Sequence, residues 1–343
     1  MCLFAALSLP AWGQAAAKEK PALVCAQCHQ AQAKTQPDTP MGHALETVAD
    51  CDILRAHPKL TFREGAYSFE IVRKGDQSIY TVTDGSQTIT VPIGWAFGLG
   101  SAGQTYVFER DGYFYESRVS YFEAVNGLDL TMGAANIHPK TIDEAAGRKM
   151  EGVAARECFA CHATNAVDKN RMTLDRMEAG VRCERCHVGA EQHAAAIKAG
   201  DAKAAMAIPR LSKLGTEEMS NFCGQCHRTW ETIALDGPKG VLNVRFQPYR
   251  LTDSKCYDAA DPRIKCVACH DPHQNVVSNA AYYDSKCLAC HAAGAHTPAL
   301  KACPVAKANC VTCHMPLVDL PGAHKKFTDH QIRIVRANEP YPN

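Results

Sequence analysis

The chain has 343 residues and a formal net charge of +1, with 37 Lys and Arg against 36 Asp and Glu. This balance provides no basic footprint for nucleic acid, and no segment beyond the N-terminus is apolar enough to span a bilayer. The composition includes 18 cysteines, so their spacing is the first pattern to interpret.

Residues 1–17, MCLFAALSLPAWGQAAA, are predicted to be a signal peptide. An apolar run from Leu3 to Leu9 is followed by Pro10 and by small residues suited to cleavage. No Lys or Arg precedes the run, so we expect the peptide to be truncated; the alternative is a buried N-terminal helix. A signal peptide predicts a periplasmic or extracellular protein.

Beyond this peptide the pattern C-x-x-C-H occurs seven times. The copies are CAQCH (25–29), CFACH (158–162), CERCH (183–187), CGQCH (223–227), CVACH (266–270), CLACH (287–291) and CVTCH (310–314). Zinc sites and redox dithiols also use C-x-x-C, but neither needs a histidine at this offset every time. In a c-type haem the two thiols bind the porphyrin covalently and the histidine binds its iron.

The sequence therefore predicts seven covalently attached haem c groups. The attachment sites would be Cys25, Cys28, Cys158, Cys161, Cys183, Cys186, Cys223, Cys226, Cys266, Cys269, Cys287, Cys290, Cys310 and Cys313. The proximal iron ligands would be His29, His162, His187, His227, His270, His291 and His314. Six motifs share residues 158–314, about 26 residues each, which is too few for an ordinary core. We therefore expect a mainly α and loop fold built around stacked haems.

The long gap after the first motif predicts an inserted antiparallel β subdomain without haem, at residues 60–130. Alternating apolar residues flank Asp84-Gly85 and Asp111-Gly112, and such turns are typical of hairpins. The segment GWAFGLGSAG (94–103) lacks the strand–turn–helix setting of a nucleotide site. We expect a wide turn there that packs Trp95 on the sheet or on a haem.

On this division residues 18–59 form a first haem segment and residues 131–335 form a six-haem domain. Residues 141–157, 189–208 and 216–235 have helical composition. Prolines from Pro238 onward indicate loops and short helices in the remainder.

Histidines outside the motifs are candidates for the second axial ligand, which is commonly an imidazole in electron-transfer haems. They are His193, His273, His296, His330, His324, His138, His57 and His43. His273 lies only three residues after His270, so we expect it to bind the iron of a neighbouring haem. Met41 is an alternative thioether ligand to His43.

Four cysteines lie outside the motifs. Cys2 would leave with the signal peptide. Cys256 and Cys303 flank the last three motifs, and a disulfide between them is plausible in an oxidising compartment. Cys51 is then a free thiol or a site of intermolecular bonding.

The segments CERCHVGAEQH, CVACHDPH and CVTCHMP, with the trailing FTDHQIR, resemble the multihaem cytochrome c superfamily. This superfamily includes the tetrahaem cytochrome c of nitrifiers, hydroxylamine oxidoreductase and pentahaem nitrite reductase. The resemblance covers roughly residues 150–335. It implies haem pairs in close contact, with His193 and His273 as distal ligands. The chain departs from it in having CHVGAEQH for C-H-G-P-G-x-x-H, no C-x-x-C-K motif, and the β insertion.

The predicted function is electron transfer between redox partner proteins, which could be other cytochromes, by a monomer, a homo-oligomer or a filament. The alternative is an oxidoreductase that acts on a small nitrogen or sulfur compound at one five-coordinate haem. A third hypothesis gives the β subdomain a structural docking role. No catalytic residue is assigned, and neither nucleic acid nor a membrane span after cleavage is expected.

Overall fold

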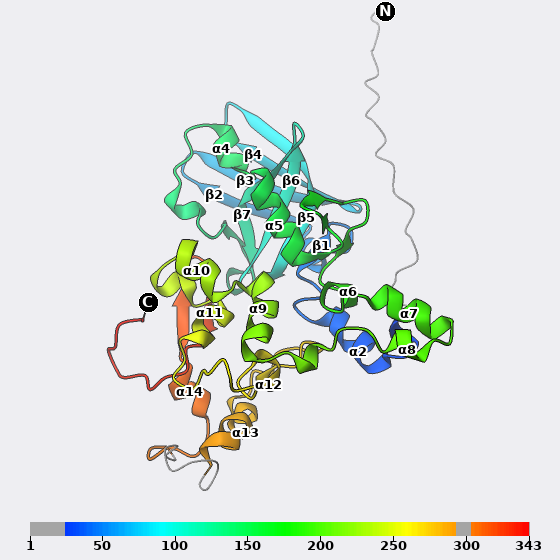
Figure 1. The fold of residues 1–343 in the computed structure, drawn as a ribbon. Coiled ribbons are helices and arrows are strands. Elements are labelled where there is room, and N and C mark those ends of the chain that lie inside the picture. The colour runs from blue at the N-terminus through cyan, green and yellow to red at the C-terminus, as the bar shows by residue number, and fades with distance from the viewer. Residues whose placement is uncertain (1–24, 293–302, 343) are drawn as a thin grey trace, which may run out of the picture.

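The computed structural model describes residues 25–292 and 303–342 (Figure 1). The proposed signal peptide and His296 lie outside the described residues. None of the helices in the described ranges combines the length and hydropathy that crossing a membrane requires.

The strands and helices have the following bounds. The strands are β1 Leu45–Thr47, β2 Lys59–Glu64, β3 Tyr67–Lys74, β4 Gln77–Thr83, β5 Thr88–Gly100, β6 Gly103–Arg110, β7 Tyr113–Phe122, β8 Gly127–Leu130, β9 Gly147–Lys149, β10 Ala163–Thr164, β11 Val167–Asp168, β12 Arg171–Met172, β13 Glu178–Ala179, β14 Leu317–Leu320 and β15 Lys325–Thr328. The α-helices are α2 Gln30–Thr35, α3 Asp52–Ala56, α4 Ile142–Ala146, α5 Gly152–His162, α6 Cys183–Cys186, α7 Ala190–Lys198, α8 Ala202–Ala205, α9 Thr216–His227, α10 Trp230–Asp236, α11 Gln247–Thr252, α12 Cys266–Cys269, α13 Ala280–His291 and α14 Cys310–His314. The 3-10 helices are η1 Gln36–Asp38, η2 Glu123–Val125, η3 Ala134–Asn136, η4 Leu211–Lys213 and η5 Gly240–Asn243.

A nine-stranded antiparallel sheet dominates the N-terminal half. Its strands follow the order β2-β3-β4-β5-β6-β7-β8, with β1 added to β5 and β9 added to β7. The predicted hairpins at both Asp-Gly turns are confirmed by the β4–β5 and β6–β7 pairings. Asp111 and Gly112 both have positive φ, as a two-residue hairpin turn of this twist requires.

This sheet makes the expected mainly α and loop fold wrong. The structure is 35 % helical and 26 % strand, and the sheet across residues 45–130 is nearly closed. The expectation treated the β region at residues 60–130 as an insertion into a haem-stacked fold, but the sheet takes in residues from Leu45 to Lys149. The N-terminal half instead forms an ordinary side-chain core, because its apolar residues alternate along strands and face one another.

The first strand of the sheet, β2, is linked by side chains to β7, which neighbours the last strand, β8. Arg118 of β7 is almost fully buried and donates from Nε and Nη2 to the Glu64 carboxylate of β2, at 2.6 and 2.7 Å. Nη2 also donates to the Ile137 carbonyl at 2.7 Å. A bidentate Arg–carboxylate pair is directional as well as strong, so it fixes β7 relative to β2 where backbone pairing ends.

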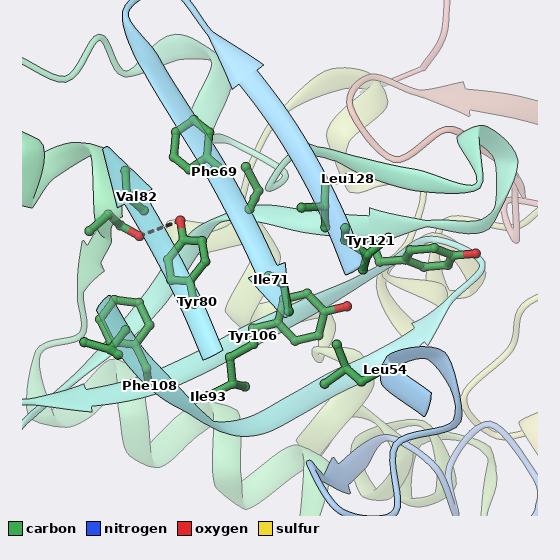
Figure 2. Close-up of a cluster of buried hydrophobic side chains, with 14 of the residues drawn as sticks. Leu54, Phe69, Ile71, Tyr80, Val82, Ile93, Tyr106, Phe108, Tyr121 and Leu128 are labelled. Atoms are coloured by element: carbon green, nitrogen blue, oxygen red, sulfur yellow. Dashed lines mark hydrogen bonds between the residues drawn. The ribbon is translucent and has the colours of Figure 1, made fainter. Parts of the chain in front are cut away.

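The inner face of the sheet forms the main core, where Phe69, Tyr80, Tyr106 and Phe108 are essentially inaccessible to solvent (Figure 2). The Tyr80 hydroxyl donates to the Ala146 carbonyl at 3.0 Å, which ties α4 to this face. The alternation of buried residues along β3 and β4 is what places these rings together.

The segment at residues 94–103 is part of the sheet, so the expected wide turn is wrong. Strand β5 continues to Gly100, with register shifts after Ile93 and after Phe97. Bulges of this kind bend a strand without ending it. Trp95 does pack on its surroundings: its ring meets that of Phe159 in α5 edge-on, at 5.2 Å between centroids.

The C-terminal half is made of short helices and loops below the sheet (Figure 1). The stretch predicted to be helical at residues 141–157 is divided by strand β9 into α4 and α5. At the other end, the β14–β15 hairpin is held to the sheet by a hydrogen bond between Nε2 of His324 and the Asp129 carboxylate at 2.8 Å.

Two glycines allow the first motif segment to contact the segment before the third motif. A Cβ on Gly180 would lie 1.9 Å from the Gly42 carbonyl oxygen, and Gly180 has a φ of +77°. Beside it, Val181 donates its backbone N–H to the Met41 carbonyl at 2.9 Å. The contact therefore depends on the absence of a side chain at Gly180.

We expect Gly180→Ala to lower the stability of the protein by about 3 kcal/mol or more, through steric overlap added to backbone strain. The matched control is Gly85→Ala: Gly85 also has positive φ, but open space surrounds its Cβ position. This control should cost only about 1 kcal/mol. Thermal unfolding followed by circular dichroism measures both, and equal shifts would contradict the close-contact argument.

Asp284 links the last two motif helices. From α13 its carboxylate accepts the backbone N–H of Asn309 at 2.7 Å and of Cys310 at 2.9 Å, at the start of α14. The N–H groups of Cys310 and Asn309 hold the pKa of Asp284 below its ordinary value of 3.8. A carboxylate at a helix start satisfies donors that the helix itself leaves unpaired.

Because the folded pKa of Asp284 is depressed, its contribution to stability is present above the unfolded value and is lost as the pH falls through the folded value. We expect Asp284→Asn to unfold at lower temperature than wild type at pH 7, and the difference to shrink below about pH 4. Asp319→Asn, at an exposed aspartate of β14, is the control. A difference that does not vary with pH would contradict this role.

Candidate functional site

Each C-x-x-C-H motif described here forms one helical turn. In the motifs of His29, His187 and His270, the backbone N–H of the histidine donates to the backbone carbonyl of the first cysteine, at 2.8 to 2.9 Å. The remaining motifs lie at the C-terminal ends of α5, α9 and α13 and within α14. Residues i and i+3 share a helix face, so both thiols of a motif lie on the same side.

The fold brings three motif histidines opposite three histidines from outside the motifs. The ring centroids of His29 and His193 are 6.3 Å apart. Those of His187 and His273 are 6.2 Å apart, with the rings only 11° from parallel, and those of His270 and His330 are also 6.2 Å apart.

This spacing fits one metal ion between two imidazoles. A histidine nitrogen binds a metal at about 2.0–2.1 Å and lies about 1.2 Å from its own ring centre, so two rings on opposite sides of one ion have centres about 6.4–6.6 Å apart. The residues present therefore fit iron bound by two imidazoles.

Hydrogen bonds at the other ring nitrogen orient many of these histidines. Nδ1 bonds a backbone carbonyl in four of them: His162 to Ala44 at 2.8 Å, His193 to Ala205 at 2.7 Å, His314 to Arg333 at 2.8 Å and His330 to Thr328 at 3.0 Å. His273 bonds the Asp271 carboxylate at 3.1 Å through the same nitrogen. A carbonyl or carboxylate acceptor there fixes the tautomer that leaves the Nε2 lone pair for a metal.

Burial lowers the pKa of five of the histidines and so favours their neutral form. It lowers the pKa of His162, His187, His227 and His270, and lowers the pKa of His330 to about 4. Only the unprotonated ring nitrogen binds a metal, so these sites do not need to lose a proton first.

The other predicted distal ligands are placed differently. Nε2 of His57 contacts the Tyr121 hydroxyl at 3.1 Å, and Nε2 of His324 contacts the Asp129 carboxylate at 2.8 Å. In both, the nitrogen that would bind iron is engaged. His43 bonds the Glu46 carboxylate through Nδ1 at 2.9 Å, which leaves its Nε2 lone pair available as in His273, but its ring is not paired with that of a motif histidine among the described residues. His138 is exposed. His296 is outside the described residues.

Thiols of different motifs also lie together. Cys25 interacts with Cys183, Cys161 with Cys226, Cys223 with Cys266, and Cys287 with Cys310. Arg185 of the third motif reaches the second and fourth, through the Ala160 carbonyl at 3.1 Å and the Cys226 sulfur at 3.7 Å. Helices α12 and α13 are in contact, so every motif adjoins at least one other.

The described cysteines outside the motifs are all free thiols. Cys256 and Cys303 do not form the disulfide that their flanking positions suggested. Cys51 is inaccessible in the sheet core, where its thiol donates to Gln104 at 3.2 Å and burial raises its pKa to about 12. Its position in the core leaves no access for an intermolecular bond.

Sequence reasoning missed the charged groups around His330. Arg250 and Asp329 form a fully buried ion pair, at 2.9 Å from Nε to Oδ1. Their residue numbers differ by 79, so no local sequence pattern predicts that these two side chains pair. Asp329 and Arg333, in contrast, are at i and i+4 around His330, and this spacing in FTDHQIR is a signal that could have been used.

Residues 129–188, which include the second and third motifs, match the family model described as "Cytochrome c554 and c-prime". No curated protein and no solved structure matches the chain. The family match supports a c-type cytochrome of the multihaem kind, with covalently bound haem c and a part in electron transfer.

Proposed function

We propose that the chain is an exported seven-haem c-type cytochrome that passes electrons between redox partner proteins in the periplasm or outside the cell. The observation that carries this proposal is the set of three histidine pairs at 6.2 to 6.3 Å. Each pair joins one motif histidine to one histidine outside the motifs. An iron with both axial positions filled is suited to electron transfer, because substrate has no place to bind.

The residues would act as follows. The fourteen motif thiols would hold the groups covalently, and the seven motif histidines would be proximal ligands. His193, His273 and His330 would be distal ligands to the irons of His29, His187 and His270. Haem iron, when bound, supplies the one-electron couple between its ferric and ferrous forms.

The order of the motifs supports transfer through the chain. The contacts between thiols join the first motif to the third, the second to the fourth, the fourth to the fifth, and the sixth to the seventh. Arg185 and the α12–α13 contact close the remaining gaps. Residues 131–335 would form a six-haem domain, residues 18–59 would hold the first haem, and the sheet at residues 60–130 would be a haem-free support.

Distal ligation predicts a specific spectroscopic change. We expect His193→Ala, His273→Ala and His330→Ala each to convert one low-spin haem to high-spin, because each opens one axial position. Low-temperature EPR of the oxidised holoprotein measures spin state, and the pyridine haemochrome measures the number of haems. His57→Ala is the control, since Nε2 of His57 is engaged by Tyr121, and its spectrum should equal that of wild type.

Two outcomes would overturn the proposal. Fewer than seven haems in the wild-type protein would refute the haem count. A stoichiometric high-spin signal in wild type that changes on adding nitrite, hydroxylamine or sulfite would favour the oxidoreductase alternative.

A further inference from the structure

Two arginines share one buried carboxylate beside His330. Arg250 of α11 is fully buried and contacts Asp329 through Nε and Nη2, at 2.9 and 3.0 Å. Nη1 of Arg333 donates to Asp329 at 2.7 Å. Both arginines lie within hydrogen-bond distance of the Asp329 carboxylate and stabilise its ionised form. Two guanidinium groups and one ionised carboxylate give this cluster one net positive charge.

The two guanidinium groups differ in how fully they are used. Arg250 also donates to the Gln331 side chain at 2.7 Å and to the Pro342 carbonyl at 3.0 Å, and its guanidinium lies over the Tyr341 ring. Arg333 donates from Nη1 to the Gln331 carbonyl at 3.0 Å, but its Nε is buried without an acceptor. A buried charged donor with no partner is costly, so this N–H calls for an acceptor that the polypeptide does not provide.

Arg333 is adjacent to two of the proposed haem sites. Its backbone N–H donates to the His314 carbonyl at 3.2 Å, and its carbonyl accepts from Nδ1 of His314 at 2.8 Å. Three residues earlier, the His330 ring faces the His270 ring. The orphaned donor therefore lies between the seventh motif and the fifth.

We propose that Nε of Arg333 donates to a propionate carboxylate of a haem held at His314 or at His270, an inference that rests on the proposed function. A haem propionate is an anionic acceptor of the type that an arginine N–H binds most strongly. The net positive charge of the cluster would then raise the reduction potential of that haem, since it favours the form with the lower positive charge.

Three variants test this proposal in the haem-loaded protein. Arg333→Gln removes the charge and the Nε donor, whereas Arg333→Lys keeps the charge and removes the Nε donor. Arg336→Gln is the matched control, because it makes the same charge change at an exposed position in the same segment. The readouts are the propionate-bending bands in resonance Raman spectra and a redox titration followed by absorbance.

We expect Arg333→Gln to shift one propionate-bending band and to lower one reduction potential. At a fixed solution potential, we expect the ratio of oxidised to reduced haem to change about tenfold. For a one-electron couple this corresponds to a shift of about 59 mV in the reduction potential. Arg333→Lys should give the band shift with a smaller change in potential. The same measurement in a His330→Ala background shows which haem carries the affected propionate. If Arg333→Gln changes the potential of the high-spin haem, the propionate belongs to the haem at His270. If it changes the potential of a low-spin haem, the propionate belongs to the haem at His314.

The proposal is overturned if Arg333→Gln and Arg336→Gln give the same Raman bands and potentials. The haem content and thermal midpoint of each variant show whether it is folded. If Arg333→Gln is not folded, the Raman bands of Arg333→Lys are compared with those of Arg336→Gln instead. Failure of the proposed function would be visible separately, as a wild-type haem count below seven.

Discussion

The arrangement of the C-terminal half depends on how each histidine ring is held. A free imidazole can rotate and present either nitrogen, but a carbonyl at Nδ1 fixes the ring and its tautomer. His193 obtains that acceptor from Ala205 of α8 and His330 from Thr328 of β15. The acceptors of His162 and His314, Ala44 and Arg333, are more distant in the sequence. Pairs at the spacing of two axial ligands require this control, since a small rotation of either ring would move its nitrogen off the shared axis.

The sheet supplies the rigid part of this control. His162 donates to the carbonyl of Ala44, next to β1, and its ring meets Phe97 of β5 at 5.3 Å. Phe159, three residues earlier in α5, packs on Phe97 and Trp95. The second motif is therefore fixed to a close-packed core. Cys161 of this motif contacts Cys226 of the fourth motif, which is positioned by that contact. The sheet thus has a direct structural role in holding the second and fourth C-x-x-C-H motifs.

The sequence predicted what is local and missed what depends on distant contacts. The C-x-x-C-H motifs and the Asp-Gly hairpins are signals within a few residues, because a helical turn and a two-residue turn each need specific neighbours. The partner of each motif histidine is set by tertiary folding, so the sequence alone could not assign His193 to His29 or His330 to His270. The overall class was wrong for a related reason: motif density describes residues 158–314, but the sheet also recruits β1 and β9 from outside the predicted insertion.

Buried polar atoms without a partner occur in both halves of the described chain. In the sheet, Arg118 pairs with Glu64 and Tyr80 with Ala146 of α4, but Oγ of Ser78 and the hydroxyl of Tyr106 have no partner. Nε of Arg333 differs from these hydroxyls in belonging to a charged group, and a buried charged donor costs more to leave unpaired than a neutral one. Arg333 also contacts the motif histidine His314 through its carbonyl. A prosthetic group held at that motif would place an acceptor next to the most costly of these unpaired atoms.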